Sequence, residues 1–205
     1  MKRFKNVFAV GFLLLIAAIS CTKTASDSSV TAEAHAEEHA TRIVSMAPSI
    51  TEILFALGLG DRVVGVSDFC DYPPEAAHKP KVGGVVNPNL EAVVALDPDL
   101  VLALPNATHE NLFRSFRQLG ITMLALPDDT LEDFYYTVSV IGKETGAEEQ
   151  ARQMVERLQA KFSAIEERVT DQPRRKVMFV VGVDPLFVAG KGPFINELIA
   201  IAGGE

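Results

Sequence analysis

Few side chains in this 205-residue sequence have the type and spacing that metal chemistry needs. Cys21 and Cys70 are too few for a cysteine zinc site or a disulfide framework. His35 and His39 stand four residues apart, a spacing that could hold a metal if the segment became helical. Their surroundings are rich in Ala and Glu and favour a solvated linker, because so little apolar surface cannot offset the entropy of ordering. We therefore expect no metal site.

Signatures of catalysis are missing from the sequence as well. There is no G-x-S-x-G motif, and residues 190–192 lack the spacing and the hydroxyl residue of a phosphate-binding loop. Asp128 and Asp129 could form a carboxylate pair, but directly before Thr130 they suit a turn and the positive end of a helix dipole. A Cys70 thiolate could coordinate a metal, although a small buried thiol is the favoured interpretation. We predict a protein without covalent chemistry of its own.

The composition indicates a folded protein and makes nucleic acids an improbable partner. With 48% apolar and 22% charged residues, the sequence is that of a folded chain with a core. Its formal net charge of -8 repels phosphate backbones, so we expect no nucleic-acid partner. Tryptophan is absent, which removes the strongest aromatic stacking surface from any ligand site.

The N-terminus has the pattern of an export signal. Three basic residues among the first five precede an apolar run at 7–19, which is shorter than the roughly 20 residues that span a bilayer. Residues 1–20 are therefore predicted to be a signal peptide. The sequence Ala-Ile-Ser-Cys that ends at Cys21 resembles the lipobox of bacterial lipoproteins, which implies a lipidated Cys21; the alternative is an ordinary signal peptide with an incidental cysteine. The composition of residues 21–41 then predicts a flexible tether.

From residue 42 onward, strand and helix patterns alternate. Capping-box patterns at Ser49 and Glu52, and a cap at Asn89, mark helix starts. Strands separated by helices of this length predict a Rossmann-like α/β lobe at 42–145 with a mainly parallel sheet. The predicted strands are 43–46, 63–66, 100–104 and 121–126, and the predicted helices include 89–96, 108–119 and 130–143.

A long helix follows this lobe. Apolar residues recur at helical spacing from 147 to 169, which at 1.5 Å per residue corresponds to about 35 Å. Thr145 and Glu148 form a second capping-box pattern, and we place the helix within 146–171. A strand at 177–181 and a helix at 193–202 come next. These two elements cannot enclose a core alone, so either they pack against the first lobe or they begin a second one.

Four stretches of the chain, in order, resemble the substrate-binding component of ABC importers for cobalamin, iron-siderophores and haem. The resemblance implies a class III periplasmic binding protein, with two α/β lobes joined by a rigid helix and a ligand held between them. It also implies that residues 172–205 are the start of an incomplete second lobe. The four stretches are residues 42–52, 64–74, 89–101 and 202–205.

The resemblance assigns roles to individual residues. It implies that Glu91 docks into an arginine pocket of the permease; the alternative is a first-turn acid favoured only by the helix dipole. It implies that Phe69 contacts the ligand; the alternative is a loop anchor packed into the core. Other candidate lining residues lie at helix starts or strand ends, where open α/β sheets bind ligands: Ser49, Val85, Leu104 and Asn106.

The resemblance also sets expectations for ligand and partners. Cobalamin is the leading candidate ligand. An iron-siderophore or haem remains an alternative, because this chain has Val85 and Leu104 where cobalamin binders have tryptophans. His109 could ligate iron or haem. We expect no cofactor and a monomer on the periplasmic or cell-surface side of a bacterial membrane. It would be lipid-anchored through Cys21 and served by an ABC permease and its ATPase. An exported chelatase-like enzyme and a ligand sensor are the alternatives from other classes. We expect weak binding, because a one-walled cleft leaves most of a ligand in water.

Overall fold

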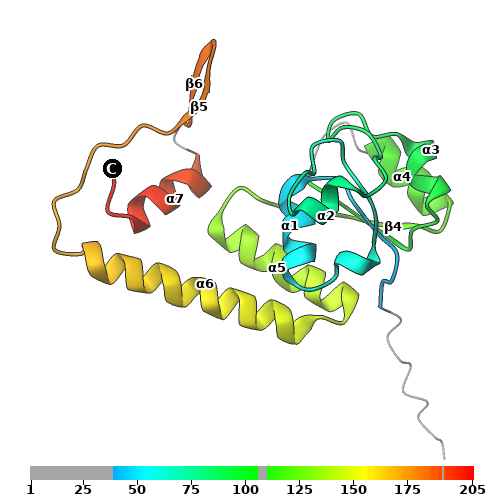
Figure 1. Cartoon of the computed structure of the whole chain (residues 1–205), viewed down its shortest axis with the longest axis horizontal. Coiled ribbons are helices and arrows are strands. Elements are labelled where there is room, and N and C mark those ends of the chain that lie inside the picture. Colours follow the sequence, from blue (N-terminus) through cyan, green and yellow to red (C-terminus); the bar gives the residue numbers. More distant parts are fainter. Residues whose placement is uncertain (1–38, 106–109, 191) are drawn as a thin grey trace, which may run out of the picture. The chain divides into compact units, whose positions relative to one another are not determined.

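A computed structural model describes residues 39–105, 110–190 and 192–205 (Figure 1). Its main sheet has four strands, β1 (Ile43–Ser45), β2 (Val63–Val66), β3 (Leu100–Ala103) and β4 (Thr122–Ala125). The strands lie in the order β2-β1-β3-β4, and every neighbouring pair is parallel. This confirms the predicted α/β lobe with a mainly parallel sheet.

Helices connect these strands and continue beyond them. A short 3₁₀ turn, η1 (Gly60–Arg62), precedes β2. The α-helices are α1 (Pro48–Ala56), α2 (Pro74–Ala77), α3 (Leu90–Ala95), α4 (Glu110–Gln118), α5 (Leu131–Thr145), α6 (Glu148–Val169) and α7 (Pro193–Ile201).

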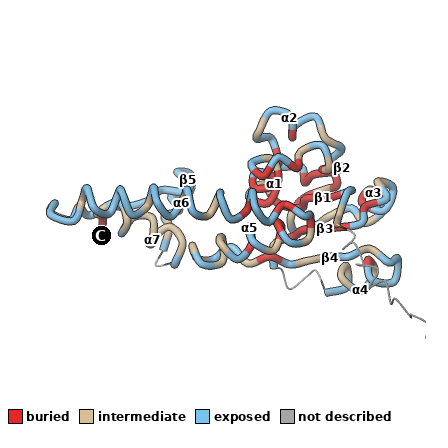
Figure 2. Tube along the Cα trace, turned by 90° about the horizontal axis from the view of Figure 1, so that it is seen from below, coloured by how far each residue is buried: buried red, intermediate tan, exposed pale blue. Residues whose placement is uncertain are grey.

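Strands β1, β2 and β3 are largely buried on both faces, whereas the edge strand β4 is partly exposed. On β3, Leu100 and Leu102 belong to one apolar cluster, together with residues of α1, α5 and the start of α6. Val101 and Ala103 alternate with them and belong to a second cluster, which includes residues of α3 and α4. Alternate residues of a strand point to opposite faces, so helices cover both sides of the sheet. Figure 2 shows the buried residues gathered on these elements, whereas most of α6 is exposed.

Two of the predicted helix caps are wrong. The capping box at Ser49 and Glu52 does not form, because Pro48 occupies the first position of α1 and Ala47 precedes the helix without a side-chain cap. The Thr145 hydroxyl does not cap α6 either. It donates to the Ile141 carbonyl at 2.6 Å, because α5 extends through Thr145 and the hydroxyl bonds back to its own helix.

Two other caps form. The side-chain oxygen of Asn89 accepts a hydrogen bond from the Ala92 N–H at 3.0 Å, as predicted. At the start of α5, the Thr130 hydroxyl accepts from the Asp133 N–H at 2.9 Å. The Asp133 carboxylate in turn accepts from the Thr130 N–H at 3.0 Å. This reciprocal pair fixes the start of α5 immediately after the β4 edge of the sheet.

Removing the Thr130 cap should destabilise the fold measurably. We expect Thr130→Ala to lower the free energy of unfolding by about 1 kcal/mol, because the Asp133 N–H loses its partner. Urea denaturation followed by circular dichroism measures this change. Thr130→Ser retains the hydroxyl and should keep most of the stability. Equal stability of the alanine variant and the wild type would contradict the capping role.

The predicted long helix is a single unbroken element. α6 has 22 residues and is therefore about 33 Å long. Its first turns contribute Ala151, Met154 and Val155 to the first apolar cluster, so it packs along α5. Its outer face carries charged residues, and no helix in the described ranges has the length and apolar character to cross a bilayer.

The residues after α6 do not extend the main sheet. β5 (Val180–Val183) pairs antiparallel with β6 (Leu186–Val188) in a separate two-stranded sheet. The strand predicted at 177–181 begins only at Val180, because the Val177 N–H donates instead to the Glu205 carbonyl at 2.9 Å. The described residues after α6 therefore add no strand to the first sheet, although the Phe194 N–H on α7 donates to the Asp129 carbonyl before α5 at 2.9 Å.

Candidate ligand-binding site

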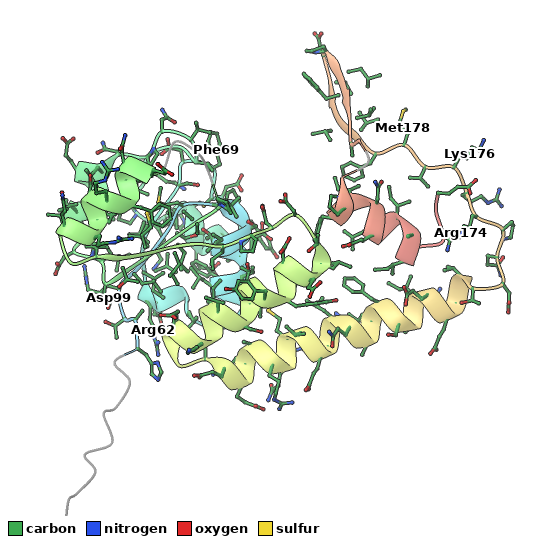
Figure 3. All side chains as sticks on the ribbon, turned by 180° about the vertical axis from the view of Figure 1, so that it is seen from behind. Arg62, Phe69, Asp99, Arg174, Lys176 and Met178 are labelled. Carbon is green, nitrogen blue, oxygen red and sulfur yellow. The ribbon has the colours of Figure 1, made fainter. Side chains whose placement is uncertain are left out.

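The carboxyl ends of the four parallel strands meet at one edge of the sheet. β1 lies between β2 and β3, so the connections from these strands leave a crevice at this edge, where open α/β sheets bind their ligands. The segments at the edge include residues 46–49 after β1, 67–70 after β2, Leu104 after β3 and 126–128 after β4. Figure 3 shows Phe69 at one end of the α/β lobe and Arg62 and Asp99, which precede β2 and β3, at the other end.

A largely apolar pocket of about 180 Å³ opens at this edge. Ser49, at the start of α1, and Leu104 both line it, as expected for residues at helix starts and strand ends. Ligand pockets for small molecules typically measure about 300–1,000 Å³, so this one accommodates only part of a large ligand. Its other lining residues are Ile50, Ile53, Pro127, Asp128, Phe134, Thr137 and Phe194.

Asp128 is the acidic group of this pocket. Partial burial raises the pKa of its carboxyl above the usual range, and the neighbouring carboxylates Asp129 and Asp133 raise it further. The turn predicted at this position is present, but the carboxylate that bonds to the start of α5 belongs to Asp133. The pocket therefore favours a neutral Asp128 more strongly than open solvent does.

Neutralising Asp128 should stabilise the fold at neutral pH. A raised folded-state pKa means that the ionised form opposes folding, so Asp128 costs stability as the pH rises through that pKa. We expect Asp128→Asn to unfold at a higher temperature than the wild type at about pH 7. The difference should disappear near pH 3, below the ordinary aspartate pKa of roughly 3.9. Thermal unfolding at several pH values tests this, with Asp171→Asn as an exposed control; a lower melting temperature for Asp128→Asn at pH 7 would contradict it.

The turn after β2 holds Phe69 at the surface. The Ser67 N–H donates to the Ser45 carbonyl at 2.9 Å, and the Cys70 N–H donates to the Ser67 carbonyl at 3.1 Å. Ser67 and Cys70 are fully buried, whereas Phe69 between them is 65% exposed. The alternative in which Phe69 anchors the loop in the core is therefore wrong. The ring is available to a ligand.

Val85 lies beside this turn rather than in the pocket. The Asp68 N–H donates to the Gly83 carbonyl at 2.9 Å, which ties the 67–70 turn to the loop that carries half-buried Val85. A methyl group placed on Gly84 would lie 3.6 Å from the Phe69 ring, so the ring lies close to this glycine. The Phe69 ring and the loop at Gly84 thus lie side by side at the same edge of the sheet.

Cys70 is the small buried thiol that the sequence predicts. It is fully buried, and the hydroxyls of Thr51 and Ser67 each lie 3.1 Å from its sulfur. Within the described ranges, no group of three or more His, Cys, Asp and Glu side chains is placed to hold a metal ion.

Glu91 is exposed in the first turn of α3, directly after the Asn89 cap. It takes part in neither of the two ion pairs found in the described part of the chain, which both lie on α6. This geometry fits a free docking carboxylate and also a first-turn acid favoured by the helix dipole.

Four residues with a possible role predicted from the sequence lie outside the described residues: Asn106, His109, Cys21 and His35. Pro127 and Asp128 were missed as pocket residues, although their position directly after a strand pattern at 121–126 was a usable signal. Phe134 and Thr137 on α5, and Phe194 on α7, were missed because nothing in the local sequence pattern brings these helices to the edge.

Comparison with known proteins supplies independent information. The periplasmic binding protein family matches residues 43–205. The chain is 36% identical over 167 residues to an ABC transporter substrate-binding lipoprotein of Bacillus subtilis (strain 168), YvrC, covering 78% of this chain and 53% of that protein. It is 32% identical to the vitamin B12-binding protein of Salmonella typhimurium, covering 81% of this chain and 62% of the relative.

A solved structure agrees with the described fold. The periplasmic heme-binding protein RhuT from Roseiflexus sp. RS-1 matches with a TM-score of 0.69 and 29% sequence identity. The match covers 80% of this chain and 64% of that one. The chain thus spans between about half and two thirds of the length of the proteins that it matches.

Proposed function

Because the chain belongs to the periplasmic binding protein family, we propose that it is an extracytoplasmic substrate-binding protein of an ABC importer. Its ligand is cobalamin, which it delivers to a membrane permease served by an ATPase. The observation that carries the proposal is the carboxyl edge of the parallel sheet, where a largely apolar pocket and an exposed aromatic ring lie on neighbouring segments. The vitamin B12-binding relative supports this choice of ligand.

The chemistry of the edge suits a large, flat chelate. The pocket lined by Ser49 and Leu104 accepts an apolar substituent, and the Phe69 ring offers a face for the macrocycle. Haem is the second candidate, since a heme-binding structure is among the matches and a porphyrin presents the same kind of face. In both cases the protein acts by binding alone and is not an enzyme.

We further propose that the mature protein is exported and held on the membrane by lipid attached to Cys21. The relative from Bacillus subtilis, a substrate-binding lipoprotein, supports this. Acyl chains contribute roughly 0.8 kcal/mol per buried methylene, which is sufficient for anchoring when several chains are attached. Mass spectrometry of the mature N-terminus tests the proposal: an unmodified start downstream of Cys21 would contradict it.

Ligand titration tests the function. The purified chain is titrated with cyanocobalamin, haemin and a ferric siderophore, and binding is followed by the visible absorbance of each chelate. We expect saturable one-to-one binding of cyanocobalamin with micromolar or weaker affinity, because a pocket of about 180 Å³ contacts only part of it. Preference for haemin would transfer the proposal to haem, and no saturable binding to any of the three would contradict it.

A further inference from the structure

The turn that carries Phe69 combines an exposed tip with a buried base. Phe69 is 65% exposed, while Ser67 and Cys70 on either side are fully buried. Packing against the core contributes little to fixing a ring that is exposed to this extent, so the orientation of the ring depends on how firmly the backbone of the turn is held. The contacts of the turn backbone therefore decide whether the ring is ordered before a ligand arrives.

Lys81 makes direct contact with both ends of this turn. Its Nζ donates to the Cys70 carbonyl at 2.6 Å and lies 3.4 Å from the Ser67 carbonyl. These two carbonyls bracket Phe69 in the sequence. Hydrogen bonds from an ionised donor are roughly twice as strong as bonds between neutral groups, so the first contact favours this conformation of the turn even though Lys81 is an exposed residue.

The backbone of Lys81 is itself fixed to the end of β2. Val66 pairs with Lys81 in an isolated parallel bridge. The Val66 N–H donates to the Pro80 carbonyl at 2.9 Å, and the Val82 N–H donates to the Val66 carbonyl at 3.0 Å. The lysine thus reaches the turn from a segment that is anchored to the sheet, so it can transmit the rigidity of the sheet to the turn.

We propose that Lys81 is a positioning residue for Phe69. Its ammonium group holds residues 67–70 in the one conformation that presents the ring to a ligand. This inference rests on the proposed function, in which the Phe69 ring contacts the chelate. If the loss of Lys81 reduces the population of that conformation to about a tenth, the apparent affinity falls by about tenfold.

The absence of tryptophan from the sequence provides a specific reporter. Phe69→Trp places a single tryptophan on the turn, and its time-resolved fluorescence anisotropy reports local motion of the ring. In this background we compare Lys81→Met, which removes the donor, with Lys81→Arg, which retains a cationic donor. Lys79→Met is the matched control, because Lys79 Nζ also donates to a backbone carbonyl, that of Gly60 at 2.9 Å, but does not contact the turn.

The expected result separates positioning from general stability. Lys81→Met should at least double the amplitude of the fast anisotropy decay, whereas Lys81→Arg and Lys79→Met should leave it close to that of the Phe69→Trp background. In the chain with native Phe69, Lys81→Met should weaken binding of cyanocobalamin or haemin by about tenfold, and Lys81→Arg should restore most of it. If Lys81→Met does not fold by circular dichroism, Lys81→Ala, which also removes the donor, takes its place in both measurements.

Two outcomes would overturn the inference. One is an unchanged fast decay in Lys81→Met; the other is a mobile tryptophan combined with unchanged ligand affinity. Failure of the proposed function looks different, because the wild type itself would then bind none of the chelates. The anisotropy comparison needs no ligand and would still decide whether Lys81 orders the turn.

Discussion

Phe69→Ala should weaken binding of the chelate by at least tenfold while leaving the fold intact. The ring is 65% exposed and contributes little to the core, so its removal should cost little stability. Aromatic anchors that dominate a binding surface are worth about 2 kcal/mol or more, which corresponds to roughly a thirtyfold change in affinity. Absorbance titration with cyanocobalamin or haemin measures the affinity, and thermal unfolding measures the stability.

Two variants control this experiment. Tyr136→Ala removes another exposed aromatic ring, which lies on α5. Unlike Phe134 and Thr137 of the same helix, Tyr136 does not line the pocket. It should leave the affinity within about twofold of the wild type, since surface changes away from a site are usually near neutral. Phe69→Trp keeps an aromatic face and should retain binding. If Phe69→Ala binds as tightly as the wild type, the turn after β2 is not part of the ligand site.

The parallel sheet could be predicted from sequence because its signals are local and mutually consistent. Short runs such as Leu100–Ala103 are apolar throughout, which matches strands covered on both faces. Asn89 was predicted correctly as a cap because its side chain bonds only three residues along the chain. Ser49 failed as a cap because Pro48 took the first helical position, a competition between two valid local signals.

Residues of the candidate pocket could be predicted only where the strand-end rule applies. Ser49 and Leu104 are candidates because each lies where a helix starts or a strand ends, and the structure places both at one pocket; their contact with a ligand stays a prediction. Phe194 could not be predicted as a pocket residue, because it comes to the pocket through contacts between segments far apart in sequence. One of these is the hydrogen bond from its N–H to the Asp129 carbonyl at 2.9 Å. The role of Lys81 was also missed. A lysine in a loop pattern gives no indication that its ammonium group reaches the Ser67 and Cys70 carbonyls.

The second large effect concerns transport rather than binding. In cells, Glu91→Ala introduced at the natural locus should lower uptake of labelled cobalamin by at least tenfold while ligand affinity stays unchanged. Glu91 is exposed in the first turn of α3 and is not among the residues that line the pocket, so we expect its loss to leave ligand affinity nearly unchanged. Truncating one partner of a buried interfacial charge pair typically costs about 2–5 kcal/mol, which at the lower limit is roughly thirtyfold in affinity for the permease.

The matched control is Glu75→Ala, because Glu75 is also an exposed acid in the first turn of a short helix, α2. Both variants remove an acid from the first turn of a short helix and lose the same kind of interaction with a helix dipole, so a loss of uptake specific to Glu91 supports contact with a partner. Glu91→Asp keeps the charge on a shorter side chain and should recover part of the transport. Equal uptake by the Glu91 and Glu75 alanine variants would leave the helix dipole as the only role of Glu91 and would remove it from the permease interface.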